Sequence, residues 1–263
     1  MWVTSVKRIL SDMRWPEVKA MIGSGAFAVV PVGSNEQHGP HLPIETDSRL
    51  VWEVVTRALD AVGDKVRAVV SPVLWCGYST HHLDFPGTLT LRPHTYIDVV
   101  TQVCESLVHH GFKKILVVNG HGGNAAAIQV AARNLRDSRP DVLVATANYW
   151  DFVRDIPEFR ESAEGCHSCE FETDLMLLLR PNLVDMKAAP KCPVKPKSGF
   201  FARALFGGKV VNVAENIRDL SVTGCWGDPT KATHEKGEKL LNALVKNMAE
   251  FLKDFDQWSI GKI

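Results

Sequence analysis

The chain has 263 residues, 45% of them hydrophobic and 23% charged, and its 30 basic side chains are balanced by 30 acidic ones. This length supports a large buried core, and we expect one domain over residues 1–263. The lack of a basic excess argues against nucleic-acid partners and against attraction to a membrane surface. No apolar segment reaches the ~18 residues of a membrane helix, and the charged N-terminal segment lacks a secretory apolar stretch, so we expect a cytoplasmic protein.

Strand-like and helix-like segments alternate along the chain, as judged from short apolar runs and from apolar residues at helical spacing. The first predicted helix has Asp47 or Ser48 available as its N-cap and Gly63 as its stop. The last is expected to begin with Asp228 as N-cap and Pro229 in its first turn. In chain order the segments are a strand at 25–33, a helix at 48–63, a strand at 66–73, a helix at 96–111, a strand at 113–120, a helix at 125–140, a strand at 141–150, and helices at 172–181 and 229–255.

The predicted strands are near-continuous runs of Val, Ile and Leu rather than alternating patterns. Strands of this kind are covered on both faces. The sequence therefore predicts an α/β fold with a mostly parallel β-sheet flanked by helices on both faces. Residues 186–226 are richer in Pro, Gly and Lys and have weak periodicity. We expect them to form a loop-rich excursion from the domain, either a loop or an oligomer contact, and not a second domain.

Polar, Gly-rich sequence follows three of the predicted strands. Ligands of open α/β sheets bind at the carboxyl ends of the strands, and in a parallel sheet these ends lie together. We therefore expect one site built from several loops, in preference to a set of polar solvated loops. Its candidate residues are Glu36, His38 and Asp47 after the first strand, Tyr78, Ser79, His81 and His82 after the second, His121 and Asn124 after the third, and His167, Glu170 and Glu172 in a later segment.

These residue types favour a metal centre with two ions. Imidazole nitrogen and carboxylate oxygen together suit Zn, Mn or Fe. Glu36 and His38 lie on the same side of an extended segment, because side chains alternate along it. An aspartate such as Asp47 has two oxygens with which to bridge two ions. Paired ions ~3.5–4 Å apart hold a shared hydroxide at neutral pH.

Six cysteines are scattered through the chain, a distribution that does not indicate a disulfide framework in a protein without a secretory signal. Cys166 and Cys169 form one C-x-x-C, which is a weak signal for a structural zinc because a second pair is missing. A redox role for these two thiols stays open at this point.

Six segments spread over nearly the whole chain carry a family pattern: PVGSNEQHGPHLPIETD, FPGTLTL, VVNGHGGN, YWDF, HSCEFETDLML and, more loosely, GCWGDPTKATHEKG. In these motifs and in their order the chain resembles the creatininase family, also called creatinine amidohydrolases. The resemblance implies a dinuclear metal hydrolase on an α/β sandwich, often a homohexamer. It also implies that one ion is held by Glu36, Asp47 and His121, and the other by His38, Asp47 and a further Glu.

The resemblance leaves two positions for that further Glu. In the creatinine-hydrolysing member it lies two residues after the N-G-H histidine, where this chain has Gly123. Relatives with this Gly carry a Glu three residues after the H-A-G histidine, which makes Glu170 the expected ligand. Glu172 is the fallback ligand, or otherwise a residue that supports the ligands by hydrogen bonds. His167 matches the family's proton-shuttle histidine, which takes a proton from the attacking water and passes it to the leaving amine.

Departures from the family pattern argue against creatinine itself as the substrate. The creatinine-hydrolysing member carries a Trp four residues before the shuttle histidine and an acidic residue directly before it, where this chain has Ala163 and Cys166. Trp150 of YWDF remains as one aromatic wall. The expected substrate contacts are Tyr78, Ser79, His81, His82, Asn124 and Trp150.

The expected activity is hydrolysis of a C–N bond in a small cyclic amide or formamide-type substrate by a metal-bridging hydroxide. The expected partners are therefore a small-molecule substrate, two divalent ions (Zn, Mn or Fe) per chain, and further copies of the same chain. Three alternatives stay open: a hydrolase of another small ring compound of the keto-inositol type, a peptide-maturation hydrolase on the same scaffold, and a metal-binding protein with a vestigial site.

Overall fold

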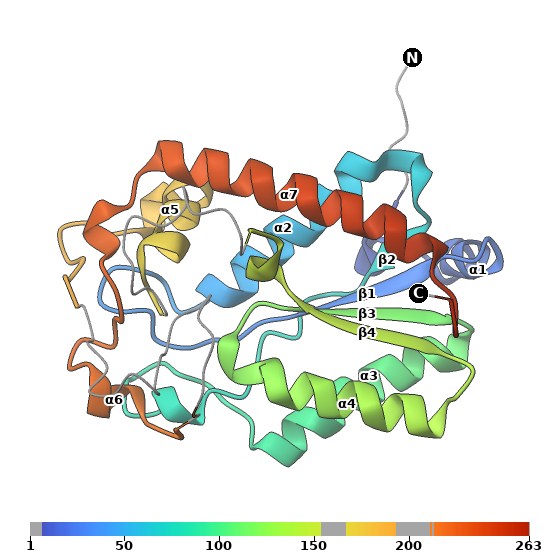
Figure 1. The fold of residues 1–263 in the computed structure, drawn as a ribbon, viewed down its shortest axis with the longest axis horizontal. Coiled ribbons are helices and arrows are strands. Elements are labelled where there is room, and N and C mark those ends of the chain that lie inside the picture. Colours follow the sequence, from blue (N-terminus) through green and yellow to red (C-terminus); the bar gives the residue numbers. More distant parts are fainter. Residues whose placement is uncertain (1–6, 154–166, 193–210, 212, 263) are drawn as a thin grey trace.

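The computed structural model describes residues 7–153, 167–192, 211 and 213–262. Its centre is a four-stranded parallel sheet in the order β2-β1-β3-β4 (Figure 1). The strands are β1 (Phe27–Val32), β2 (Ala68–Val70), β3 (Lys114–Asn119) and β4 (Leu143–Asn148). Phe27 pairs with Ala68 on one side of β1, and Ala28 pairs with Ile115 on the other. All six residues of β1 are buried, which confirms the prediction of a parallel sheet covered on both faces.

Helices cover both faces of the sheet, with α2 and α7 on one side and α3 and α4 on the other (Figure 1). Alternation along β1 divides the core between them: Val29 packs with residues of α2 and α7, and Val30 packs with residues of α3 and α4. The helices are α1 (Trp15–Gly23), α2 (Thr46–Val62), α3 (Pro93–His110), α4 (Ala125–Ser138), α5 (Glu170–Leu179), α6 (Ile217–Leu220) and α7 (His234–Gln257). The 3-10 turns are η1 (Leu10–Asp12), η2 (Gly63–Lys65), η3 (Thr80–His82), η4 (Gly122–Asn124), η5 (Tyr149–Val153), η7 (Pro181–Leu183) and η8 (Pro229–Lys231).

The predicted starts of two helices were wrong. Helix α2 has Glu45 at its N-cap position, so Asp47 and Ser48 lie inside the first turn. Asp47 is turned toward neighbouring imidazoles, and the Ser48 hydroxyl donates to the Ser34 carbonyl. Helix α7 begins only at His234, because the Thr233 hydroxyl accepts the Lys236 N–H and caps it.

The structure also differs from the prediction just before α7 and at the short helices α1 and α6. Asp228 and Pro229 belong to the separate turn η8 and not to α7. Helix α1 was missed because it buries none of its residues and so lacks a clear apolar period. Within 186–226, the structure describes α6 and connecting loops, whereas 193–210 and 212 lie outside the described residues.

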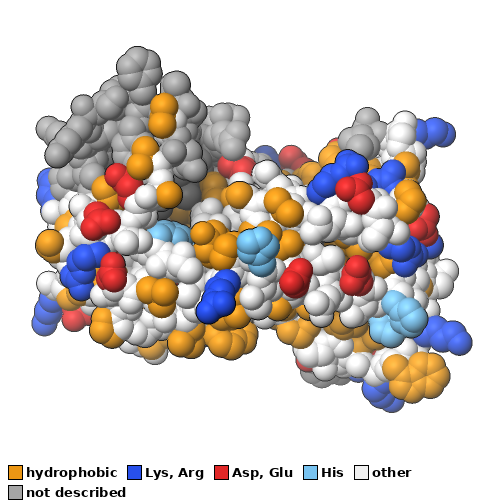
Figure 2. Space-filling view, turned by 90° about the horizontal axis from the view of Figure 1, so that it is seen from below, with side chains coloured by type: hydrophobic (Ala, Val, Ile, Leu, Met, Phe, Trp, Pro, Cys, Tyr) orange, Lys and Arg blue, Asp and Glu red, His pale blue; other side chains and the backbone are white. Residues whose placement is uncertain are grey.

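The surface agrees with the balanced composition. Acidic and basic side chains are interspersed over the described part of the face in Figure 2, without a broad area of one charge. Among the helices that the structure describes, none has the length and apolar character that crossing a membrane requires.

Candidate metal centre

The polar side chains predicted at the strand ends lie together in the interior. Glu36 and His38 are in the loop after β1, Asp47 is in the first turn of α2, and His121 follows β3. His167 precedes α5 and is held there by backbone hydrogen bonds to Trp226. The first turn of α2 approaches the end of β3 closely because Gly120 has no side chain: a Cβ there would lie 2.7 Å from the Asp47 carbonyl oxygen.

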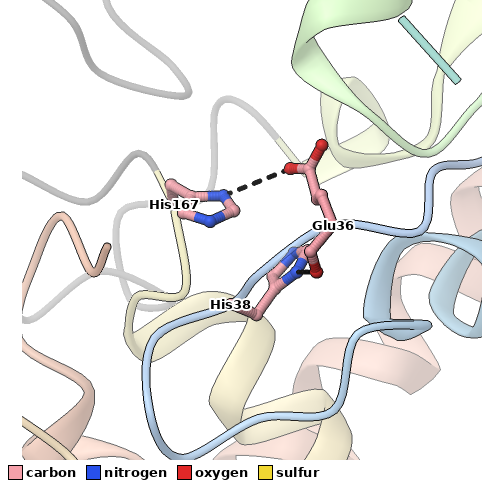
Figure 3. Close-up of side chains that lie close together, drawn as sticks. All are labelled: Glu36, His38 and His167. Atoms are coloured by element: carbon pink, nitrogen blue, oxygen red, sulfur yellow. Dashed lines mark hydrogen bonds and ion pairs between the residues drawn. The ribbon is translucent and has the colours of Figure 1, made fainter. Parts of the chain in front are cut away.

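Three groups of ligand-type atoms overlap in this cluster. They are Glu36, Asp47 and His121; His38, Asp47 and Glu172; and Glu36, His38 and His167. All six residues are buried, none being more than 7% exposed. Figure 3 shows the His167 ring directed at the Glu36 carboxylate, with the His38 ring beside both.

Asp47 occupies the centre of the cluster, because its two oxygens face different imidazoles. Oδ1 is 3.1 Å from His38 Nε2, and Oδ2 is 3.0 Å from His121 Nδ1. The Glu36 carboxylate is similarly placed, since its Oε1 lies 3.2 Å from His121 Nδ1 and 3.6 Å from His167 Nδ1. Glu172 is more distant, with Oε1 3.8 Å from His38 Nε2.

The donor set and its spacing fit divalent metal ions. Two ligand atoms that each bind one ion at about 2.0–2.2 Å are separated by roughly 3.0–3.4 Å, close to the spacing of these atoms. One oxygen each of Glu36, Asp47 and Glu172 is buried without a hydrogen-bond partner among the described residues, namely Oε1, Oδ2 and Oε2. Buried carboxylate oxygens left in this way require compensation, and a cation bound between them would supply it.

Main-chain carbonyls fix which nitrogen of three imidazoles carries the proton. His38 Nδ1 lies 3.1 Å from the Glu36 carbonyl, His121 Nε2 lies 3.2 Å from the Tyr78 carbonyl, and His167 Nε2 lies 2.8 Å from the Gln37 carbonyl. A carbonyl only accepts, so each of these nitrogens donates an N–H. The other nitrogen of each ring is thereby directed at the carboxylates, as in metal-ligating histidines.

Burial and neighbouring charges divide the imidazoles into two classes. Burial disfavours the charged form of His121, but Glu36 and Asp47 outweigh it and raise the pKa of His121 to about 10. The pKa of His38 is raised well above its ordinary value by Asp47 and Glu172 in the same way. Burial and the nearby charge of His38 hold the pKa of His167 well below its ordinary value.

The carboxylates follow the same electrostatics. Burial alone would raise the pKa of Asp47, but the adjacent His38 and His121 hold it well below its usual range. His82 is the third imidazole near Glu36, with Nε2 3.3 Å from Oε1. Burial and the positive charge of neighbouring imidazoles keep the pKa of His82 well below its ordinary value. An ionised Asp47 and a neutral His167 are therefore present together near pH 7.

The structure groups Glu172, rather than Glu170, with His38 and Asp47. Glu170 is buried as well, but its Oε1 accepts a hydrogen bond of 2.7 Å from Lys236 Nζ at the start of α7. Glu170, which the family resemblance made the expected further carboxylate ligand, therefore pairs with Lys236 of the protein itself.

Several residues expected to contact substrate make internal hydrogen bonds. Asn124 is fully buried, accepts the Tyr78 N–H and donates to the Gly33 carbonyl. Ser79 is fully buried between Ser34 and His121. His81 is half-buried and stacks on His121, with ring centroids 5.6 Å apart.

Trp150 belongs to the hydrophobic core, where it contacts Tyr149 edge-on. Tyr149 itself lies close enough to the carboxylates of Glu172 and Asp47 that, after burial, their charge raises the pKa of its hydroxyl well above the ordinary value. Apart from its place in YWDF, no sequence feature pointed to Tyr149.

Gln37 connects the cluster to a loop far along the chain, and sequence reasoning missed it. Its Oε1 accepts the Gly39 N–H, and its Nε2 donates to the Gly224 carbonyl and lies 2.8 Å from His82 Nδ1. The fixed amide makes that Nδ1 an acceptor, so His82 carries its proton on Nε2, facing Glu36. Gln37 stands between two candidate ligands in the sequence, which is the signal that could have identified it.

The predictions for Ala163 and Cys166 lie outside the described residues. Cys169 is buried at the N-cap position of α5.

A model of the creatininase family, described as creatinine amidohydrolase, matches residues 11–252. The chain is 30% identical to the creatinine amidohydrolase of Pseudomonas putida, over 93% of this chain and 96% of the relative. It is 31% identical to the mycofactocin precursor peptide peptidase of Mycolicibacterium smegmatis, over 86% and 84% of the two chains. It is 24% identical to the 3-dehydro-scyllo-inosose hydrolase of Thermotoga maritima, over 95% and 85%.

Solved structures agree with the fold. One from Bacteroides fragilis superposes with a TM-score of 0.82 and 28% identity, over 98% of this chain and 99% of its own. A mutant creatininase described as Zn-Zn type and a creatininase with Mn each superpose with a TM-score of 0.78 over 94% of this chain and 98% of theirs, at 28% and 27% identity.

Proposed function

The chain belongs to the creatininase family, and on this premise we propose that it is a metal-dependent amidohydrolase that cleaves a C–N bond of a small cyclic amide or formamide-type substrate. The observation that carries the proposal is the buried cluster in which one carboxylate oxygen each of Glu36, Asp47 and Glu172 has no hydrogen-bond partner among the described residues and lies beside candidate imidazole ligands. Buried carboxylate oxygens left in this way require compensation, and divalent ions bound between them would supply it.

The proposed centre takes two divalent ions. Glu36, Asp47 and His121 would hold one, and His38, Asp47 and Glu172 would hold the other, with Asp47 shared because its oxygens face His38 and His121 separately. Glu172 replaces Glu170 in this assignment. Zn, Mn and Fe all suit the ligand set, and solved relatives are described with Zn and with Mn.

Ions bound here would polarise the substrate carbonyl and lower the pKa of water. His167 is the proposed proton carrier. Its Nε2–H is held by the Gln37 carbonyl, so Nδ1 faces Glu36 and the interior of the cluster. With its pKa held low, His167 is neutral near pH 7 and can accept the proton of the attacking water at Nδ1, then deliver it to the leaving nitrogen.

His82 and Gln37 complete the arrangement. Gln37 Nε2 and the His82 Nε2–H orient His82 toward Glu36, which keeps that carboxylate turned to the cluster. We also propose that the protein forms a homo-oligomer, a hexamer by family resemblance. Light scattering on the protein as it elutes from a size-exclusion column measures its mass, and the mass of a monomer would refute the oligomer.

The relatives differ in the substrates on which they act. Those compared above act on creatinine, on a precursor peptide and on an inosose, so the family alone does not select the bond. An activity panel of lactams, formamides, short peptides and keto-inositols separates the proposed amidohydrolase from a peptide-maturation hydrolase and from a hydrolase of keto-inositol-type rings.

The decisive experiment joins metal analysis to that panel. The wild type should carry about two divalent ions per chain and hydrolyse a lactam or formamide. Glu36→Ala and His121→Ala should lose metal and activity together, whereas His167→Ala should keep its metal and lose activity by roughly 10²–10⁴-fold. His109→Ala, an exposed histidine at the end of α3, is the matched control and should change neither. Full activity in metal-free protein would refute the proposal, and a wild type without metal would favour a vestigial site.

A further inference from the structure

Two buried hydroxyls connect Glu36 to His121 on the side away from the other ligands. Ser34 follows β1 and Ser79 lies in the loop after β2, and both are fully buried. Ser79 Oγ is 3.1 Å from His121 Nε2, the two hydroxyl oxygens are 2.5 Å apart, and Ser34 Oγ is 3.1 Å from Glu36 Oε2. The chain of contacts therefore starts at one proposed ligand and ends at another.

The direction of every hydrogen bond in this chain is determined. The Ser34 hydroxyl donates its one proton to Glu36 Oε2. Ser34 must then accept from Ser79, which has used its one proton and accepts from His121 Nε2–H. The same Nε2–H also faces the Tyr78 carbonyl, an obligate acceptor, which agrees with this protonation.

The geometry closes a ring. His121 presents Nδ1 and Glu36 presents Oε1 to the same space, 3.2 Å apart, while their far atoms are joined through the hydroxyls. The residues of the ring come from the ends of three neighbouring strands, β2, β1 and β3.

We propose that Ser34 and Ser79 are positioning residues of the metal centre: their hydrogen-bond relay keeps the proton of His121 on Nε2 and turns Oε1 of Glu36 toward the ion that both residues hold. This inference rests on the proposed function, since it assumes that Glu36 and His121 are ligands. It reassigns Ser79, which the sequence suggested as a substrate contact, to the support of the ligands.

The two hydroxyls differ in what their loss leaves behind. Without Ser34, no donor remains for Glu36 Oε2 among the residues that the structure describes. Without Ser79, His121 still has the Tyr78 carbonyl, and Ser34 still donates to Glu36. Removal of the Ser34 hydroxyl is therefore the larger perturbation. Without it, Ser79 has no hydrogen-bonded connection to Glu36.

The test measures zinc affinity by chelator competition and zinc content after equilibration in a zinc buffer. Ser34→Ala should bind zinc ~10–100-fold more weakly than wild type, and Ser79→Ala should show a smaller loss. The double variant should match Ser34→Ala, because a broken relay cannot be broken twice. Ser71→Ala removes a buried hydroxyl that donates to the Pro72 carbonyl, outside the relay, and should bind as wild type does.

Three outcomes overturn the inference. They are wild-type zinc affinity in both single variants, losses that multiply in the double variant, or a lower melting temperature of the metal-free variants without a change in zinc affinity. If Ser34→Ala does not fold, the zinc affinity of Ser79→Ala tests the inference alone, because that variant keeps the hydrogen bond from Ser34 to Glu36 Oε2. A wild type that binds no zinc would instead remove the proposed function.

Discussion

Metal loading of this protein should release protons, and the number follows from the cluster. In the metal-free protein at pH 7, His121 has a pKa of about 10 and His38 has a pKa well above its ordinary value. Both rings are therefore imidazolium before metal binds. A metal ligand must be a neutral imidazole, so each ring loses one proton on loading.

The imidazoles release about two protons per chain, one from His38 and one from His121, and a bound water that becomes hydroxide would release one more. His167 and His82 add none, because the pKa of each is already held well below its ordinary value. These two rings alone should make the overall zinc affinity rise about 100-fold per pH unit near pH 7, or roughly 2.7 kcal/mol per pH unit at two protons.

Calorimetry in buffers with different ionisation enthalpies measures this release directly, because the heat of loading then depends on the buffer. The wild type and His109→Ala should each release the two imidazole protons together with any proton lost by bound water, and His121→Ala should release about one fewer. Heat that is independent of the buffer would show that these imidazoles are neutral before loading or are not ligands. Either result would refute the electrostatic reasoning.

Three further predictions follow from single features. Glu172→Gln should reduce the metal content from about two ions per chain to about one, whereas Glu170→Gln, its matched control, should keep both; elemental analysis decides, and the reverse result would restore Glu170 as the ligand. The metal-free protein should lose stability as pH rises from about 6.5 through about 10, because the raised pKa of His121 stabilises the fold only while the ring is protonated, and it should also lose stability on acidification as Asp47, whose pKa is lowered, becomes protonated. Melting curves against pH test this, and an unchanged alkaline limb in His121→Ala would contradict it. Phe255→Ala should lower the free energy of unfolding by about 3–5 kcal/mol in urea titration, since the ring is fully buried edge-on to Phe27 at 5.1 Å; a loss below about 1 kcal/mol would mean that the core refills the space.

The fold was predictable because its strongest signals are local. Continuous apolar runs mark strands buried on both faces, and Gly63 and Gly111 mark helix ends with positive φ, as the structure confirms. Helix starts were less predictable because several side chains compete for a cap. Thr233 caps α7, whereas Asp228, which is equally suitable in isolation, precedes a separate turn.

The candidate site was predictable where the backbone is extended and ambiguous where it is helical. Glu36, His38 and His121 follow strand ends, so topology alone brings them together. Glu170 and Glu172 both lie in the first turn of α5, where two positions differ by about 200° around the axis. Which of them faces His38 depends on how α5 packs and on Lys236 of α7, and neither is readable from spacing.

Under the proposed ligand set, Gly123 explains why the second carboxylate comes from α5 in this chain. The family resemblance places the corresponding ligand Glu of the creatinine-hydrolysing member at this position. Here a Cβ at Gly123 would lie 2.5 Å from the Tyr78 carbonyl oxygen, 2.7 Å from a His81 ring carbon, and closer still to His121 Nε2. The Tyr78 backbone cannot retreat without losing its hydrogen bonds to His121 and Asn124. The loop after β2 thus occupies the space that a side chain at position 123 would need, and Glu172 approaches the second half of the cluster from the opposite element.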